Sequence, residues 1–322
     1  MTDYITKNDT IIFDPLFNKR LDNELLLNYK KIIFSDYKLD VVLFDIYKNN
    51  ILDRYEFHDT IIYIGSKFNK QLLKGLFNLV NLTHLTFGQK FNKLLSNSLN
   101  NLTNLTHLIF GTEFNKPLSN SLDNLTNLTH LIFGEMFNNC LLNSLDKLVN
   151  LMYLDLGERY NQSLSNSLDN LTNLTHLTFG YAFNQPLLNS LNNLTNLTHL
   201  TFGYTFNQSL LNSLNYLTNL THLSIDYLFD KKFDLTPSIK SIYLNSNNKY
   251  IIENLPNSIE ELEFGYDFDL ELDNLPSSIK KIIFNKHCCY TKSLNNLPNS
   301  ISLLILPEKY NLKIANIPVK IN

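Results

Sequence analysis

Histidine recurs at a fixed spacing in this chain, and its side chain is the one here with the widest chemistry. Imidazole can bind a metal ion, titrate near neutral pH or hydrogen-bond a protein partner. Six of the eight histidines are separated by multiples of 23 residues: His84, His107, His130, His176, His199 and His222. They therefore define one repeated position, and the elements around it decide which of these chemistries is available.

The histidines lie within a 23-residue repeat. The heptapeptides LTHLTFG or LTHLIFG occupy residues 82–88, 105–111, 128–134, 174–180 and 197–203. In the first of them, Leu82, Leu85 and Phe87 follow the pattern L-x-x-L-x-F, which predicts a short strand with one buried face. A period of this length is typical of a solenoid whose coils stack on their neighbours. We predict a β-rich solenoid, similar to leucine-rich repeats: a stack of about 12 coils, each with one short parallel strand, and few or no long helices.

Other positions of the repeat form columns with predicted structural roles. Glycine is expected to end each strand in a backbone conformation that larger residues resist. The glycines are Gly65, Gly88, Gly111, Gly134, Gly157, Gly180 and Gly203. An aromatic column is expected to form an interior spine: Phe68, Phe91, Phe114, Phe137, Tyr160, Phe183 and Phe206. Residues 96–101, rich in Ser and Asn, are expected to form turns on the convex side.

Asparagine directly follows each residue of the aromatic column. We predict that these side chains form a buried, structural ladder, because an amide can satisfy the backbone of the next coil. The predicted ladder comprises Asn69, Asn92, Asn115, Asn138, Asn161, Asn184 and Asn207.

The residues that flank the second Leu of the strand are expected to point away from the core. The first of these positions is the predicted partner-binding column, His84, His107, His130, Tyr153, His176, His199 and His222. Beside it run Thr86, Ile109, Ile132, Asp155, Thr178, Thr201 and Ser224, and Tyr181, Tyr204 and Tyr227 follow the strand ends.

Three interpretations of this column remain open. The histidines are a by-product of repeat duplication, or they belong to a stripe that binds a partner, or neighbouring imidazoles share a metal ion. No third ligand is evident for a metal. Because protons repel along such a column, we predict a shared titration with lowered pKa values. The repeat around Tyr153 breaks the pattern and is the most charged, with Asp155, Glu158 and Arg159. It is the first place to look for a specific contact.

Composition limits the function classes. The net charge is -3 and charged residues are 18% of the chain, which does not fit a nucleic-acid binder. No motif of a hydrolase, P-loop or zinc protease is present, so we expect no enzyme activity, no cofactor and no metal. The adjacent Cys288 and Cys289 after His287 lack a second ligand pair at zinc spacing.

Location is predicted from the same composition. Three cysteines without regular spacing favour a reducing compartment. We find no signal peptide and no run that would span a membrane, and we expect an intracellular, cytoplasmic protein that makes no membrane contact. The Asn-Leu-Thr glycosylation sequons, such as those at Asn81 and Asn104, are then a by-product of the repeat.

Two motifs resemble the FNIP repeat family. The pair F-N follows the strand motif and is often followed by Pro-Leu, as at Pro117 and Pro186. Farther along, Leu-Pro segments such as 255–259 lead into strands such as 262–265, with shorter spacing. The resemblance covers roughly residues 61–315. It implies a leucine-rich-repeat-like protein of the kind found in social amoebae and in giant DNA viruses of amoebae, which places a viral member in host-cell cytoplasm. Many viral members carry an N-terminal F-box, but residues 1–60 lack its Leu-Pro-x-Glu opening.

The predicted organisation has three parts. Residues 1–60 hold degenerate coils or a cap, with strands at 11–13 and 32–34 and a short helix as one option within 36–60. Residues 61–226 hold the regular repeats, and residues 227–322 continue the solenoid with shorter Leu-Pro repeats and a C-terminal cap.

The predicted function is a non-enzymatic scaffold that binds a protein partner along the strand face, as a monomer unless its ends stack. The alternative is a substrate-recognition subunit of a ubiquitin ligase, which needs a docking segment hidden within residues 1–60. A viral protein of this kind would act in host–virus interaction.

Overall fold

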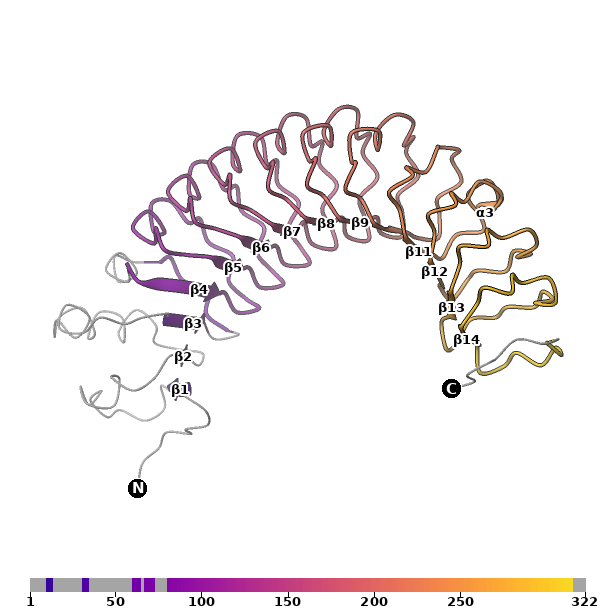
Figure 1. Ribbon diagram of the computed structural model, residues 1–322. Coiled ribbons are helices and arrows are strands. Elements are labelled where there is room, and N and C mark those ends of the chain that lie inside the picture. The colour runs from indigo at the N-terminus through magenta and orange to yellow at the C-terminus, as the bar shows by residue number, and fades with distance from the viewer. Residues whose placement is uncertain (1–9, 14–30, 35–59, 65–66, 73–79, 315–322) are drawn as a thin grey trace, which may run out of the picture. The chain divides into compact units, whose positions relative to one another are not determined.

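The computed structural model describes most of the chain in two compact units. The residues described are 10–13, 31–34, 60–64, 67–72 and 80–314 (Figure 1). The first unit comprises Met1–Gln162 with Asn166–Leu171, and the second comprises Ser163–Ser165 with Thr172–Asn322. Each unit is a β-solenoid with one short strand per coil.

The first unit contains seven described strands, which pair in parallel in the order of the chain. They are β1 (Thr10–Phe13), β2 (Lys31–Phe34), β3 (Thr60–Ile64), β4 (Leu82–Thr86), β5 (His107–Ile109), β6 (His130–Ile132) and β7 (Tyr153–Asp155). Strands β4 to β7 lie along one side of their coils, and the turns lie on the other (Figure 1). The two degenerate strands predicted before residue 60 are confirmed as β1 and β2. The predicted short helix within 36–60 lies outside the described residues, as does Gly65.

The second unit also contains seven described parallel strands in chain order. They are β8 (His176–Thr178), β9 (His199–Thr201), β10 (His222–Ile225), β11 (Ser241–Leu244), β12 (Glu261–Phe264), β13 (Lys281–Phe284) and β14 (Leu303–Ile305). Strands β10 to β14 start at residues 222, 241, 261, 281 and 303, so the coils shorten to 19, 20, 20 and 22 residues. The predicted shorter coils are therefore confirmed.

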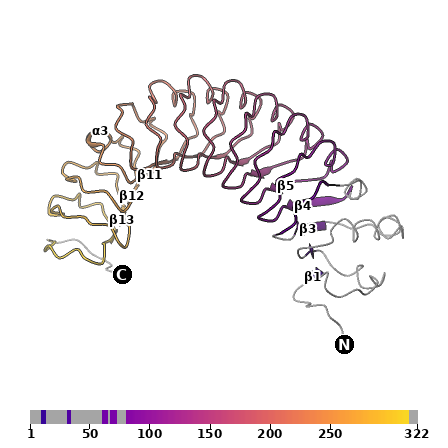
Figure 2. The ribbon, with the colours of Figure 1, turned by 180° about the vertical axis from the view of Figure 1, so that it is seen from behind.

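Helix contributes little to the described structure. Its one helix is α3 (Lys249–Glu253), a single turn (Figure 2). The side chain of Asn248 caps this turn by accepting a hydrogen bond from the backbone of Tyr250. Within the described ranges, no helix is long and apolar enough to cross a membrane. The prediction of few or no long helices holds for this part of the chain.

The core is built from stacked copies of the same side chains. In β5 the central Leu108 is fully buried, whereas His107 and Ile109 on either side are half-buried. The aromatic spine is buried as predicted, and its members stack with a centroid separation of 6.0 Å between Phe91 and Phe114. A second aromatic position, directly after the strand, packs against this spine, with centroids 4.2 Å apart between Phe87 and Phe91.

The glycine column is required by close packing between coils. A Cβ atom at Gly134 would overlap the carbonyl oxygen of Gly111, and one at Gly203 would overlap that of Gly180. The predicted reason, an unusual backbone conformation, is wrong for most of the column. Among the described glycines only Gly157 has a positive φ, +79°. Glycine is needed because the backbones approach too closely for any side chain.

The Ser- and Asn-rich segment forms turns, as predicted: residues 96–101 are in turn conformation throughout. Left-handed backbone occurs at this position of successive coils, for example at Ser96 (φ 47°) and Ser119 (φ 48°). Short polar side chains tolerate this conformation best, because they can hydrogen-bond locally.

The predicted asparagine ladder connects successive coils by hydrogen bonds. The backbone N–H of Asn115 donates to Oδ1 of Asn92 over 3.0 Å, and that of Asn138 donates to Oδ1 of Asn115 over 3.0 Å. The same bond joins Asn207 to Asn184 over 2.9 Å in the second unit. The prediction that the ladder is buried is wrong. Asn69, Asn115 and Asn138 are exposed and the other members are half-buried, because the residue after the buried aromatic ring points outward at the coil edge.

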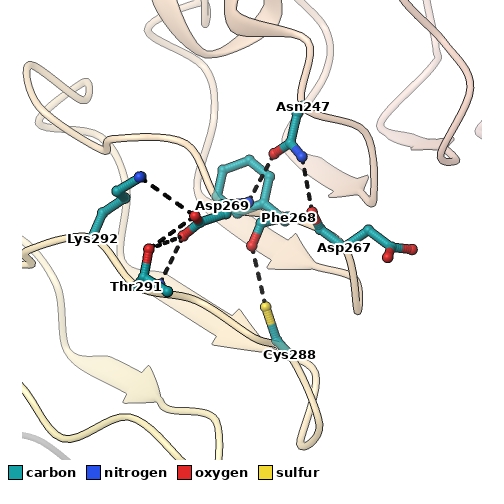
Figure 3. A network of polar contacts seen from close by, with 7 residues as sticks. All are labelled: Asn247, Asp267, Phe268, Asp269, Cys288, Thr291 and Lys292. Atoms are coloured by element: carbon teal, nitrogen blue, oxygen red, sulfur yellow. Dashed lines mark hydrogen bonds and ion pairs between the residues drawn. The ribbon is translucent and has the colours of Figure 1, made fainter.

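Other polar residues continue this ladder where the sequence changes (Figure 3). The backbone N–H of Asp269 donates to Oδ1 of Asn247 over 2.8 Å, and that of Thr291 donates to Oδ1 of Asp269 over 2.7 Å. Lys292 forms an ion pair with Asp269 at 3.4 Å. Any short side chain with an oxygen acceptor therefore serves this position.

A second asparagine ladder was not predicted. Asn127 donates its side-chain amide to the carbonyl of Thr103 over 2.9 Å, and Asn150 donates to that of Thr126 over 2.9 Å. Equivalent bonds join Asn104 to Val80, Asn196 to Thr172 and Asn219 to Thr195. All of these residues except Asn150, which is followed by Leu-Met, are the Asn of an Asn-Leu-Thr triplet. The triplet therefore recurs because its amide bonds the backbone of the preceding coil.

The close glycine packing makes a direct prediction. Gly134→Ala should lower the free energy of unfolding by about 1–3 kcal/mol, because the new Cβ must push two coils apart. Urea unfolding followed by circular dichroism measures this change. Thr112→Ala, in the neighbouring coil, is the matched control and should cost under about 0.5 kcal/mol. Equal losses in the two variants would contradict the packing argument.

The exposed ladder makes a second prediction. Asn115→Ala should lower the free energy of unfolding by about 0.5–1.5 kcal/mol, less than for a buried amide because water can replace the lost acceptor. Asn115→Asp keeps an oxygen acceptor and should lose less. Thermal and urea unfolding of the two variants test the order. An alanine variant as stable as the wild type would show that the ladder is not structural.

Candidate partner-binding face

The histidine column of the first unit is a stack of parallel rings. Ring centroids are 4.0 Å apart between His84 and His107 and 4.1 Å apart between His107 and His130, with interplanar angles of 13° and 9°. Tyr153 continues the stack at 5.7 Å from His130. All four side chains are half-buried on the strand face. The parallel strands are in register here, so equal residues necessarily lie over one another.

The second unit repeats this arrangement. His199 lies 4.1 Å from both His176 and His222, and its ring is nearly parallel to both. Beyond the strand ends, Tyr204 stacks on Tyr181 with centroids 4.9 Å apart. The predicted histidine column and the predicted tyrosines of this unit therefore each form an ordered stack.

A threonine directly before each histidine fixes the ring. In the first unit, Oγ1 of Thr106 lies 2.9 Å from Nδ1 of His107, and Oγ1 of Thr129 lies 2.9 Å from Nδ1 of His130. The Thr106 hydroxyl also donates to the carbonyl of Thr83, the threonine one coil earlier, over 3.0 Å. The second unit has the same arrangement, with Thr198 2.8 Å from His199 and bonded to the carbonyl of Thr175.

This double contact determines the histidine tautomer. A hydroxyl has one proton, and a carbonyl oxygen can only accept, so the Thr106 proton must go to the carbonyl. Its oxygen then accepts from His107, which must carry its own proton on Nδ1. The lone pair on Nε2, at the opposite edge of the ring, is therefore left as an acceptor. The same reasoning applies to His130 and His199, so the strand face offers a repeated hydrogen-bond acceptor.

Three of the stacked histidines, His107, His130 and His199, have lowered pKa values and are neutral at physiological pH. Partial burial, together with the neighbouring imidazoles His84 and His130, lowers the pKa of His107 to about 4. Partial burial, with His222 and His176, likewise lowers the pKa of His199 to about 4. Burial also lowers the pKa of His130. These shifts have the direction that the sequence predicted for a column of like groups.

The stack geometry does not suit a shared metal ion. The Nε2 lone pairs of parallel stacked rings point in the same direction, whereas a metal needs ligands that converge on it. In the part of the chain that the structure describes, no three His, Cys, Asp or Glu side chains are grouped to hold a metal. At the Cys288–Cys289 pair, the buried Cys288 thiol donates to the carbonyl of Phe268 over 3.3 Å, and burial raises its pKa to about 11.

The structure explains part of the irregular sequence in the coil around Tyr153. Asp155 accepts the backbone N–H of Gly157 over 2.9 Å, and Gly157 is the described glycine in the left-handed region. Burial raises the pKa of Asp155. Arg159 lies 3.9 Å from Glu135 of the preceding coil. These charged residues thus serve a turn and an ion pair within the first unit, and the predicted contact site there stays untested.

Sequence reasoning missed the role of the threonines. The dipeptide Thr-His recurs in all six regular copies, and that recurrence was the available signal. It was interpreted only as part of the strand motif, because sequence does not show where a hydroxyl proton goes. The six threonines are Thr83, Thr106, Thr129, Thr175, Thr198 and Thr221.

Comparison with known families supports the predicted resemblance. The sequence model of the family described as FNIP Repeat matches residues 229–267 and 247–287. No curated protein matches the chain. Residues 229–287 therefore match the FNIP repeat, and they belong to a solenoid with a leucine-rich-repeat-like fold.

Solved structures with the same fold come from distant proteins. An internalin (InlF) of Listeria monocytogenes is 18% identical with a TM-score of 0.55, over 82% of this chain and 78% of the internalin. A chain of the Toll–Spatzle complex of Drosophila is 12% identical with a TM-score of 0.62, over 92% of this chain and 46% of that one. A chain of the TLR13–ssRNA13 complex is 15% identical with a TM-score of 0.57, over 89% and 46%. This chain thus spans under half of the last two, and at these identities the likeness shows the fold alone.

The fixed tautomer and the lowered pKa values can be tested together by nitrogen-detected NMR. His107 and His199 should show the Nδ1–H tautomer at pH 7 and should take up a proton only near pH 4. The unfolded chain takes up these protons first, near its ordinary pKa of 6.5. The free energy of unfolding should therefore fall as the pH is lowered from 6.5 toward 4. Thr106→Val should release the tautomer of His107 and leave that of His199 unchanged. Titration of both rings near 6.5 would contradict the account.

Proposed function

We propose that this chain is a non-enzymatic scaffold that holds a protein partner along the strand face of its coils. Leucine-rich-repeat-like solenoids are typical interaction scaffolds, because successive coils offer a long surface of repeated side chains. The observation that carries the proposal is the threonine–histidine arrangement. It holds equal rings in equal orientations in each regular coil and presents the same acceptor atom every time.

The chemistry of the face favours binding over catalysis. Imidazoles whose pKa is near 4 and whose Nδ1 proton is held by threonine are poor general bases at neutral pH. Beside them, the half-buried Ile109 and Ile132 give the first unit an apolar stripe, and Thr178 and Thr201 occupy that position in the second. A neutral surface of rings, methyl groups and hydrogen-bond acceptors suits a protein contact.

A protein partner fits this chain better than a nucleic acid. The net charge is -3, and a row of neutral histidines offers no cations to a phosphate backbone. The Toll–Spatzle and TLR13–ssRNA13 complexes carry the names of a protein and an RNA ligand, and both remain properties of those proteins.

The ubiquitin-ligase alternative depends on residues 1–60. The structure describes β1 and β2 there, which pair in parallel with the strands that follow, and no described feature favours a docking module. The cytoplasmic location stays a prediction. The viral origin and the host–virus interaction, which the resemblance implies, also stay predictions.

The test compares lysine substitutions on the strand face with lysine substitutions on the turns. The double variant Ile109→Lys and Ile132→Lys puts two cations on the face of the first unit, whereas Ser119→Lys and Leu142→Lys puts two on exposed turn positions. The face variant should lose about tenfold or more of the partner captured from the source cell, and the turn variant should stay within about twofold. Circular dichroism melts establish that both variants fold.

A photo-cross-linking residue in place of His107 supplies a second readout. It should attach to the same partner that capture identifies, and the same residue in place of Ser119 should not. Equal loss of partner in the face and turn variants, or cross-links from the turn position alone, would contradict the proposal.

A further inference from the structure

A second aromatic surface lies in the second unit, where the regular repeats give way to the shorter coils. Tyr227 follows the end of β10 and stacks on Tyr204 with centroids 5.2 Å apart. Tyr243 lies on the strand face of β11 and Tyr266 follows β12. Tyr227 and Tyr266 are 39% and 52% exposed, and Tyr243 is half-buried. Three successive coils therefore present a tyrosine on or beside the strand face.

Three carboxylates lie among these rings. Asp226 directly follows β10, Glu263 is paired in register with Tyr243, and Asp267 follows Tyr266 by one residue. All three lie near enough to Tyr243 to raise its pKa, in addition to the larger effect of its burial. We call Tyr227, Tyr243, Tyr266, Asp226, Glu263 and Asp267 the tyrosine–acid surface.

These carboxylates differ from several others of the same unit, which have cation partners. Glu261 pairs with Lys281 at 2.7 Å, and Glu260 pairs with Lys280 at 2.7 Å. Asp226, by contrast, accepts hydrogen bonds only from neutral groups, among them the side-chain amide of Asn245 at 2.7 Å. Within the described residues, none of the three carboxylates of the tyrosine–acid surface forms an ion pair, so no cation of that part of the chain compensates their negative charge.

The rings of this surface make few aromatic contacts among the described residues. Tyr243 and Tyr266 stack on no other aromatic ring among the described residues, and Tyr227 stacks on one ring only. The cation–π contact of the described residues lies elsewhere, with Lys232 over Tyr250 at 5.6 Å. Aromatic faces attract cations because of the ring quadrupole, and neighbouring carboxylates strengthen that attraction. The tyrosine rings and the carboxylates of this surface therefore both attract a cation, and no cation of the described residues occupies it.

A guanidinium group matches this surface better than a metal ion or an ammonium. The carboxylates are separated by tyrosine rings, and no three ligands in the described part of the chain are grouped to hold a metal. A guanidinium is planar, stacks on an aromatic face and binds a carboxylate through two N–H groups at once. Adjacent parallel strands are about 4.8 Å apart, so an extended segment crossing them can place successive side chains on successive coils.

We propose that the tyrosine–acid surface binds an arginine-rich segment of the partner protein, each guanidinium stacked on a tyrosine and paired with a neighbouring carboxylate. The inference rests on the proposed scaffold function and names the chemistry of what one part of the strand face holds. The tyrosines and carboxylates of β10 to β12 supply aromatic faces and negative charge for the segment, whereas the histidine stacks carry no carboxylate.

The test is fluorescence anisotropy on the full chain, at about 0.1 M salt so that distant charges are screened. The probe is a labelled peptide of four Arg-Ser repeats. A citrulline version, which keeps the shape but lacks the charge, and a lysine version are the comparisons. The arginine peptide should bind about tenfold or more tightly than the citrulline peptide, and also more tightly than the lysine peptide. Equal binding of the arginine and citrulline peptides would overturn the inference.

Variants locate the binding on the surface. The triple variant Asp226→Asn, Glu263→Gln and Asp267→Asn should weaken binding about tenfold or more, and it keeps an oxygen acceptor for Asn245. A matched control removes three carboxylates elsewhere, by Asp123→Asn, Glu253→Gln and Glu271→Gln, and should stay within about twofold. Equal loss in the two triple variants would mean a non-specific charge effect and would overturn the inference.

The tyrosines have their own variant. Tyr227→Leu with Tyr266→Leu keeps the charge and should still weaken binding of the arginine peptide by about fivefold or more. Unchanged binding would overturn the stacking arrangement. Cross-linking from position 107, in the first unit, tests the scaffold function independently of the peptide-binding assay. A partner that cross-links there while the arginine peptide fails to bind would overturn this inference and leave the scaffold function standing.

Discussion

In-register pairing of parallel strands is the constraint on which the rest of this structure depends. Because backbone hydrogen bonds join each strand to the same residues of the next, every side chain lies over its counterpart one coil away. The glycine contacts, the aromatic spine, both asparagine ladders and the threonine–histidine stacks all follow from that registration. A side chain is acceptable at a position only if it can stack on a copy of itself, or on whatever replaces it.

The sequence was sufficient for the strands and the core, because alternation around Leu85 and the fixed position of Phe91 leave few other ways to bury them. It was insufficient where two different physical mechanisms would produce the same sequence pattern. Glycine at Gly134 fits either an unusual backbone angle or a close backbone approach, and only the structure shows the second. The ladder through Asn115 was predicted with its bonding but with the wrong burial, because periodicity does not show which side of a coil edge meets water.

The candidate site shows the same division. The histidine column and its lowered pKa values could be predicted, since repeated like groups must interact. The tautomer could not, because it depends on the hydroxyl of Thr106 being committed to a carbonyl one coil earlier. The regular coils and the shorter coils also carry two different kinds of surface. Regular coils offer a uniform neutral face, whereas the shorter coils bring Tyr243 and Glu263 together and create local charge.

Coil registration is tested most directly by removing chain in units of the repeat. Deletion of residues 105–127 takes out one whole 23-residue repeat and joins Asn104 to Leu128, which restores the repeat at the junction. Deletion of residues 105–116 takes out about half of a coil and leaves the remainder without a strand. Thermal unfolding followed by circular dichroism should show a cooperative transition and a strand signal for the whole-repeat deletion, and a loss of both for the half-repeat deletion. Equal damage from the two deletions would contradict the account, because the coils would then not be the units that the structure stacks.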